Sequence, residues 1–287
     1  MLVARKPSQL RSLLVLARAS NLPTVWSNCL AGWLLGGGGE QAKFFWLCLG
    51  ATFLYSGGMF LNDAFDANFD RQHRRLRPIP SGAIPERHVW CWGFVLLGLG
   101  AGALSCMGQT TVILTVLLIV FILLYDAIHK LVPFSPVLMA GCRSLLYLVA
   151  ASVSEEGITG LAVWCALALG AYIVGLSYLA RKETSRGPLQ SWPCYFLAVP
   201  GVLALLINSG TYLQKALIIL LSVVVWILWS LRHIFWKTQR NIGLSISLLI
   251  AGIPLLDALA VGGANMSAIF VALFFLALLF QKFIPAT

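Results

Sequence analysis

Asn62, Asp63, Asp66 and Asp70 end a long apolar stretch with a spacing that suits one face of a helix. At 100° per residue, a helix continuing through this stretch places all of them within an arc of roughly 100°. A carboxylate at the centre of a membrane helix costs roughly 2.5 to 3.5 kcal/mol, and neighbouring carboxylates repel one another. We therefore expect a cation here, and oxygen ligands of this kind suit Mg²⁺, which usually binds through carboxylates and substrate phosphates. The alternative is a polar helix end that reaches water.

The composition is typical of a polytopic membrane protein. Of the 287 residues, 59% are hydrophobic and only 10% are charged, whereas a soluble domain carries about a quarter of its residues as charges. The net charge of +10 is explained by the preference of cytoplasmic loops for Lys and Arg. No nucleic-acid-binding module is visible in the sequence, so we expect membrane lipids around the chain and no nucleic acid.

Apolar runs predict about ten transmembrane helices in a single domain over residues 1–287. Each run is close to the 20 or so residues that a hydrocarbon core of about 30 Å requires. The runs lie near residues 21–38, 44–62, 89–107, 109–125, 134–153, 158–180, 192–208, 212–231, 241–262 and 266–281. The sequence therefore predicts an all-α transmembrane bundle.

The distribution of basic residues predicts the orientation of this bundle. With both termini in the cytoplasm, nearly all of the 20 Lys and Arg residues fall on the cytoplasmic side. Lys43 and Lys215 fall outside, and Arg143 lies within a span. Because cytoplasmic loops are enriched in Lys and Arg, this asymmetry favours cytoplasmic termini and a cytoplasmic acidic stretch.

The acidic stretch is followed by a basic loop with the sequence Arg77-Pro78-Ile79-Pro80-Ser81-Gly82. Together, Asn62-Asp63-x-x-Asp66-x-x-x-Asp70 and this loop resemble the first signature of the UbiA superfamily of intramembrane prenyltransferases. The resemblance implies a nine-helix core with one added helix and a central cavity that opens near the cytoplasmic side. It also implies Mg²⁺-dependent transfer of a prenyl group from an allylic prenyl diphosphate to a small acceptor within the membrane.

The resemblance extends to individual site residues. The implied metal ligands are Asn62, Asp63, Asp66 and Asp70, with the three aspartates and Lys130 as catalytic residues. Diphosphate contacts are implied for Asn62, Arg74, Arg77, Tyr125 and Lys130. Simpler explanations also exist, since a solvated basic loop accounts for the arginines and an anchor at the membrane surface accounts for Lys130.

Further polar residues lie within the predicted spans. Arg143 has apolar neighbours on both sides, which is costly unless the side chain is paired or faces a cavity. It either binds an anionic group or forms a structural ion pair. Asn21 and Asn28 suit a cavity wall. Asp257, near the outer end of a span, has no role that we can assign from the sequence.

The chain departs from the superfamily at its second aspartate-rich motif. That place reads Ser177-Tyr178-Leu179-Ala180-Arg181-Lys182-Glu183-Thr184, with one carboxylate and two cations. Either Tyr178, Arg181 and Lys182 contact the diphosphate directly, since fixed cations do part of a metal's electrostatic work, or ionisation is no longer supported. Glu183 is a candidate cavity residue.

These alternatives lead to different functions. In the first the chain is a prenyltransferase with an altered site; in the second it binds or translocates a prenylated or lipid-like metabolite. The altered run resembles a branch of the superfamily with EboC-type proteins of bacterial gene clusters, which implies a bacterial inner (plasma) membrane. An unrelated transporter would not explain the Arg-Pro-x-Pro-Ser-Gly loop.

Overall fold

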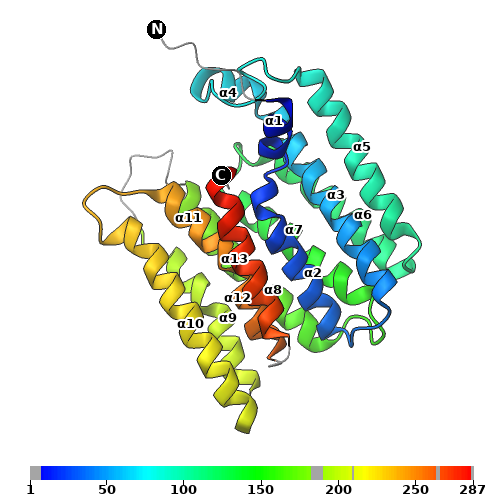
Figure 1. Cartoon of the computed structure of the whole chain (residues 1–287), viewed down its shortest axis with the longest axis vertical. Helices are drawn as coiled ribbons and strands as arrows, with labels where there is room; N and C mark the ends of the chain where they lie inside the picture. Colours follow the sequence, from blue (N-terminus) through cyan, green and yellow to red (C-terminus); the bar gives the residue numbers. More distant parts are fainter. Residues whose placement is uncertain (1–7, 182–189, 209, 263–265, 286–287) are drawn as a thin grey trace.

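A computed structural model describes residues 8–181, 190–208, 210–262 and 266–285. Within these ranges the chain forms helices and no strands, which confirms the all-α prediction (Figure 1). In chain order the elements are α1 (Gln9–Leu16), the 3₁₀-helix η1 (Ala19–Asn21), α2 (Leu22–Leu35), α3 (Gln41–Phe65), α4 (Ala67–His73), α5 (Glu86–Ser105), α6 (Gln109–Ile128), α7 (Ser135–Ser152), α8 (Gly160–Arg181), α9 (Pro193–Ile207), α10 (Gly210–Phe235), α11 (Ile242–Ala251), α12 (Ile253–Val261) and α13 (Ser267–Phe283).

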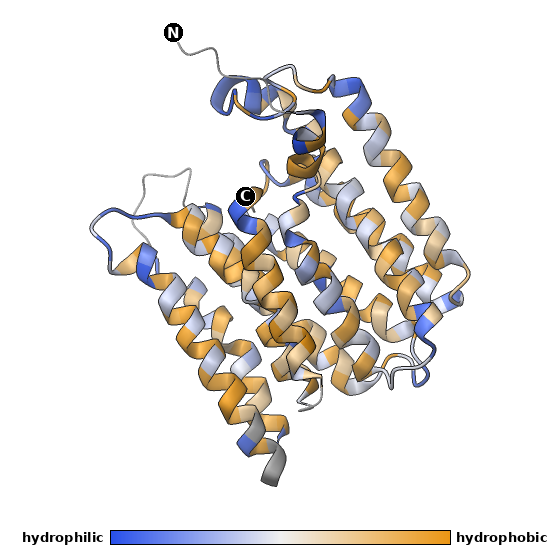
Figure 2. Cartoon of the chain, in the orientation of Figure 1, coloured by the Kyte–Doolittle hydropathy of each residue, from blue (hydrophilic) through white to orange (hydrophobic). Residues whose placement is uncertain are grey.

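Seven segments in the described ranges are long and apolar enough to cross a membrane. They are α3, α5, α6, α7, α8, the part of α10 from Ala216, and the consecutive pair α11 and α12. α9 and α13 are shorter apolar helices. Figure 2 shows hydrophobic residues along the helices and hydrophilic residues gathered towards their ends. Each predicted apolar run coincides with one helix, except the run near residues 241–262, and the number of membrane crossings remains a prediction.

The run predicted near residues 241–262 is broken into two helices. α11 ends at Ala251 and α12 begins at Ile253, with Gly252 between them and Pro254 near the start of α12. Proline has no backbone N–H, and its ring clashes with the preceding turn, so a helix breaks before it. Half of the residues of α11 and most of those of α12 are buried.

The helix that carries the acidic stretch, α3, packs closely along α5. Glycines on the two helices face one another, and a Cβ atom added at Gly57 would lie 2.9 Å from the carbonyl oxygen of Gly93. Small residues at a membrane helix contact let the backbones approach closely. This packing holds the length of α3 against a rigid neighbour.

A small apolar cluster supports the polar end of α3. Leu16 of α1 and Phe60 of α3 pack there with Ile79 and Ile84 of the α4–α5 connection. The connection is therefore anchored by apolar side chains rather than extended into water. The C-terminal region reaches the same end of the molecule, where the Ser20 hydroxyl donates to the Pro285 carbonyl at 3.4 Å.

Candidate functional site

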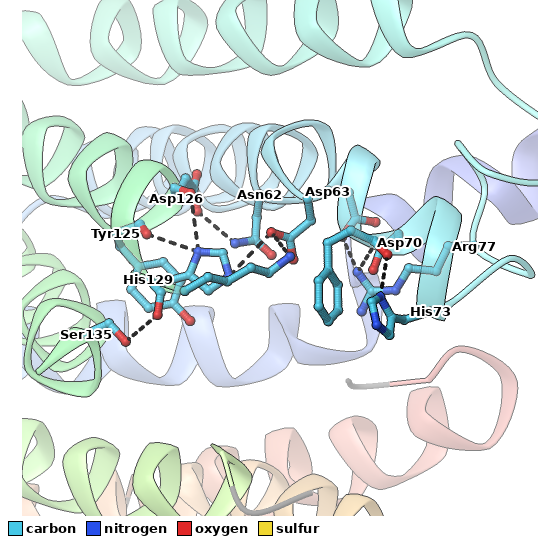
Figure 3. Close-up of polar contacts among 12 residues, drawn as sticks. Asn62, Asp63, Asp70, His73, Arg77, Tyr125, Asp126, His129 and Ser135 are labelled. Atoms are coloured by element: carbon cyan, nitrogen blue, oxygen red, sulfur yellow. Dashed lines mark hydrogen bonds and ion pairs between the residues drawn. The ribbon is translucent and has the colours of Figure 1, made fainter. Parts of the chain in front are cut away.

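The acidic stretch forms a buried polar surface where α3 passes into α4. The helix is interrupted at Asp66, yet the backbone N–H of Asp66 still donates to Asn62 and that of Asp70 to Asp66. The predicted shared face is therefore kept across the break. Asn62, Asp63, Asp66 and Asp70 are all buried, and Asp70 is only 1% exposed. Figure 3 shows how side chains from α6 and the α4–α5 connection approach this surface.

Arg77 bridges two of the carboxylates. Its Nη1 atom lies 2.9 Å from Asp63 Oδ1 and 3.1 Å from Asp70 Oδ2 (Figure 3). The loop that carries Arg77 is held by Ile79 and by the Ser81 hydroxyl, which donates to the Pro78 carbonyl at 3.2 Å. The basic loop therefore lies directly against the acidic stretch.

Asp66 is paired with the end of α6. Lys130 Nζ lies 2.5 Å from Asp66 Oδ1 and 4.0 Å from the centre of the Phe69 ring, and His129 Nε2 lies 3.4 Å from the same carboxylate oxygen. Burial alone would raise the pKa of the Asp66 carboxyl. The hydrogen bonds from His129 and Lys130 outweigh burial and hold that pKa below its usual range.

Arg18 is a site residue that we did not predict from the sequence. Its Nη2 donates to Asn62 Oδ1 at 3.4 Å and lies 3.8 Å from Asp63 Oδ1. The backbone φ of Arg18 is +42°, a left-handed conformation that is costly for a residue other than glycine. Burial opposes the charge of Arg18, but Asp63 raises the pKa of this guanidinium above its ordinary value. The side chain is therefore a permanent cation beside the acidic surface.

Arg18, Arg77 and Asp63 also line an open pocket, whose empty volume is about 910 Å³ with the adjoining solvent included. The exposed side chain of Arg74, another predicted diphosphate contact, lies on the rim of this pocket with Arg75. Multiple arginines around one concave surface suit a ligand rich in phosphate oxygens, because guanidinium groups pair with such oxygens through several hydrogen bonds.

The acidic residues suit Mg²⁺ in their chemistry. Each of them offers a side-chain oxygen as a metal ligand, and Asp70 Oδ1 is buried without a hydrogen-bond partner. In the described part of the chain, no group of three or more His, Cys, Asp or Glu side chains is close enough to hold a metal ion. Instead, Arg77 and Lys130 form ion pairs with the carboxylates, so metal binding at this surface requires these two side chains to move.

A second, mainly apolar pocket lies deeper in the bundle and has an empty volume of about 560 Å³. Tyr55, Tyr125, Asp126 and Arg143 are among the residues that line it. Asn62 Nδ2 donates to Asp126 Oδ1 at 3.0 Å (Figure 3), so one side chain links the acidic surface with this inner pocket. Tyr125 stacks on His129, with ring centres 5.0 Å apart.

Arg143 reaches α2 rather than the acidic surface. Its Nη1 donates to Asn28 Oδ1 at 2.8 Å and its Nη2 to the Thr24 hydroxyl at 3.1 Å. Asn28 in turn donates to Asp257 Oδ2 at 2.8 Å, so the residue to which we assigned no role is tied to Arg143. Asn21, the other predicted cavity residue, is buried at the start of α2, and its carbonyl accepts from Thr24 at 2.7 Å.

The second motif is described only as far as Arg181. The guanidinium of Arg181 donates to the carbonyl oxygens of Val132 and Pro133, and Tyr178 packs against Trp192 with ring centres 4.8 Å apart. Tyr178 and Arg181 line a separate pocket of about 770 Å³ with Pro133. Lys182 and Glu183 lie outside the described residues, so the diphosphate role of this motif remains a prediction.

Comparisons with solved structures show where this fold recurs. A UbiA homolog from Archaeoglobus fulgidus bound to GPP and Mg²⁺ superimposes with a TM-score of 0.64 at 13% identity, over 92% of this chain and 99% of that one. The apo structure of a UbiA homolog from Aeropyrum pernix K1 gives a TM-score of 0.62 at 16% identity, over 85% and 97% of the two chains. At these identities the likeness shows a shared fold.

Comparisons of sequence agree with the fold. The chain is 31% identical over 110 residues to a 4-hydroxybenzoate octaprenyltransferase of Edwardsiella ictaluri and over 112 residues to 4-hydroxybenzoate geranyltransferase 1 of Lithospermum erythrorhizon. These matches span 38% of this chain and only 37% and 35% of those proteins. The family model for UbiA prenyltransferases matches residues 22–241. This integral membrane protein therefore belongs to the UbiA prenyltransferase family.

Proposed function

We propose that this protein transfers a prenyl group from an allylic prenyl diphosphate, bound with Mg²⁺, to a small acceptor within the membrane. The observation that carries the proposal is the buried acidic surface on α3 and α4, flanked by Arg18, Arg77 and Lys130. Oxygen ligands for a divalent ion and cations for a diphosphate lie within one site, which is the combination that this reaction needs.

Asn62, Asp63, Asp66 and Asp70 are the residues that would hold Mg²⁺. The bound ion would neutralise the charge that develops on the diphosphate as its allylic carbon–oxygen bond breaks. Arg77 and Lys130 then exchange their carboxylate partners for diphosphate oxygens, and Arg74 joins them from the open pocket that it lines with Arg77. On this proposal, Arg77 and Lys130 form ion pairs with the metal-binding carboxylates as long as no diphosphate is bound.

The inner pocket is our proposed site for the reacting carbon and the acceptor. Its walls are mainly apolar, which excludes water from an electron-poor allylic carbon, and Tyr55 and Tyr125 offer aromatic rings beside it. The relatives from Edwardsiella ictaluri and Lithospermum erythrorhizon are named for 4-hydroxybenzoate. We propose an aromatic acceptor of this kind, with Arg143 receiving an acidic group.

In the second motif, Ser177–Thr184, cationic side chains bind the diphosphate directly and replace the carboxylates that would hold a second metal ion. Tyr178, Arg181 and Lys182 are the proposed contacts, and Glu183 is a proposed cavity residue. The protein would act in a bacterial plasma membrane with this site on the cytoplasmic side. The asymmetry of Lys and Arg supports the cytoplasmic side, and membership of the UbiA prenyltransferase family supports a diphosphate ligand.

The deciding experiment is diphosphate release by the purified protein in detergent. Geranyl, farnesyl or geranylgeranyl diphosphate is supplied with Mg²⁺ and 4-hydroxybenzoate, and the product is identified by mass spectrometry. Substitution of Asp66 by asparagine should reduce release on the order of a hundredfold or more. Glu86→Gln is the matched control, because Glu86 pairs with Arg71 at the same end of the bundle but outside the acidic surface.

Two outcomes would count against the proposal. Equal release by the wild type and the Asp66→Asn variant would remove the metal-site assignment. Tight binding of prenyl diphosphate without any release, in the presence of 4-hydroxybenzoate, would instead favour the alternative in which the chain binds or translocates a prenylated metabolite.

A further inference from the structure

A buried chain of hydrogen bonds joins two opposite charges on different helices. Arg143 in α7 donates to Asn28 in α2, and Asn28 donates to Asp257 in α12, each at 2.8 Å. The Ser27 hydroxyl donates to the same Asp257 oxygen at 2.5 Å. Asn28 is 0% and Asp257 1% exposed. The network thus lies inside the bundle, where an isolated charge is costly and a compensating charge is needed.

The side-chain amide between the two charges has a chemical consequence. A direct ion pair with Asp257 would occupy the fork of the guanidinium, which is shaped to bind one carboxylate through two hydrogen bonds. Here Arg143 instead donates to one amide and one hydroxyl, Asn28 and Thr24. An arginine has five N–H donors. Within the described part of the chain, this arrangement leaves donors of Arg143 for a ligand.

Arg143 also has access to a place where a ligand can lie. It lines the inner pocket of about 560 Å³ and lies 5.7 Å from the centre of the Tyr55 ring. The other charged residue on this pocket is Asp126, whose Oδ1 accepts from Asn62. The pocket therefore has a cation at one position, a carboxylate at another and apolar walls between them.

We propose that Asp257, acting through Asn28, is the resident counter-charge that compensates the charge of Arg143 while the inner pocket is empty, and that an acidic ligand shares Arg143 with it when the pocket is filled. Asp257 and Asn28 are then positioning residues for Arg143. The inference rests on the proposed function in one respect, since it specifies the charge of the acceptor. It differs in that it concerns binding and stability rather than transfer.

The test is rescue of a charge-deleted variant by an external anion. Thermal unfolding in detergent is measured for the wild type, Asp257→Asn, Arg143→Gln and the double variant, each with 4-hydroxybenzoate or the neutral 4-hydroxybenzyl alcohol. Asp257→Asn leaves Arg143 without its counter-charge, so its Tm should fall by several degrees. 4-Hydroxybenzoate should then raise the Tm of this variant more than that of the wild type, and the neutral alcohol should not.

The double variant supplies the internal control. Because it carries neither charge, it should be more stable than Arg143→Gln alone and should not distinguish the carboxylate from the alcohol. In Asp257→Asn, the carboxylate should bind tighter than the alcohol by on the order of tenfold, the effect of one charge-assisted hydrogen bond. Should Asp257→Asn fail to fold, the comparison of Arg143→Gln with the double variant still decides whether the two charges are coupled.

The proposal is overturned when the two substitutions add in the double variant, or when both ligands raise the Tm of Asp257→Asn equally. Diphosphate release from geranyl diphosphate is measured on the same preparations. Charge-dependent rescue without any prenyl transfer would refute the proposed function and keep this inference. Transfer to 4-hydroxybenzoate without charge-dependent rescue would support the proposed function and refute this inference.

Discussion

Each carboxylate of the acidic surface is paired with a cation from another part of the chain. Asp63 and Asp70 share Arg77, and Asp66 is held by Lys130. Removing one partner of a buried pair leaves an uncompensated charge, which is strongly destabilising. A divalent cation that binds these carboxylates can replace such a partner, so the ion pairs and the proposed metal site compete for the same oxygens.

This competition predicts that the Lys130→Met variant binds a divalent ion more tightly than the wild type when no prenyl diphosphate is present. Loss of a charge-assisted hydrogen bond of about 1.5 to 3 kcal/mol corresponds to a gain on the order of tenfold or more in affinity. Titration with Mn²⁺, followed by electron paramagnetic resonance in detergent, measures it. Arg71→Gln is the control, because Arg71 pairs with Glu86 instead. Unchanged or weaker Mn²⁺ binding in Lys130→Met would contradict the competition.

Arg18 gives a second prediction at this scale. Arg18→Gln removes a cation that contacts both Asn62 and Asp63. The affinity for geranyl diphosphate with Mg²⁺ should fall on the order of tenfold, the cost of one hydrogen bond to a charged group. Arg11→Gln, in the exposed part of α1, should leave the affinity unchanged. Equal affinities for the two variants in a binding titration would show that Arg18 only supports the fold.

The close contact between α3 and α5 gives a prediction at the scale of elements. A valine at Gly57 would press against the backbone of Gly93 and Leu97, and such overpacking costs about 1 to 3 kcal/mol. Because α3 carries the acidic stretch, Gly57→Val should lower both the Tm and the affinity for prenyl diphosphate. Gly98→Val is a matched control on α5, since a Cβ atom there meets nothing within 4 Å. Similar losses in both variants would contradict this role of the contact.

Local sequence patterns identified most elements but few long-range contacts. Apolar length located the helices, and the spacing of Asn62, Asp63, Asp66 and Asp70 predicted their shared face. The break at Gly252 and Pro254 was missed, because the apolar run continues through it. Arg18 carries no short-range signal, since a left-handed turn brings it to the site. Asn28 and Asp257 meet only because α2 packs on α12.

At the scale of the whole molecule, the candidate site, α1 and the C-terminal end of α13 share one end. α3 and α6 end there, α1 lies beside them, and the C-terminal end of α13 approaches η1 (Figure 1). The turn between α7 and α8 lies at the opposite end, with Gly157 in a left-handed conformation. The cations of the site thus occupy the end that the positive-inside rule assigns to the cytoplasm.

Reporter fusions in bacterial cells test this orientation. Green fluorescent protein fused after Thr287 should fluoresce, and alkaline phosphatase at that position should be inactive, because the first folds in the cytoplasm and the second outside it. Alkaline phosphatase fused after Gly157 should be active, since this turn lies across the membrane from the site. The reverse result at both positions would show that the acidic surface faces away from the cytoplasm. A prenyl diphosphate made in the cytoplasm would then be on the wrong side of the membrane, so this outcome would also remove the proposed donor.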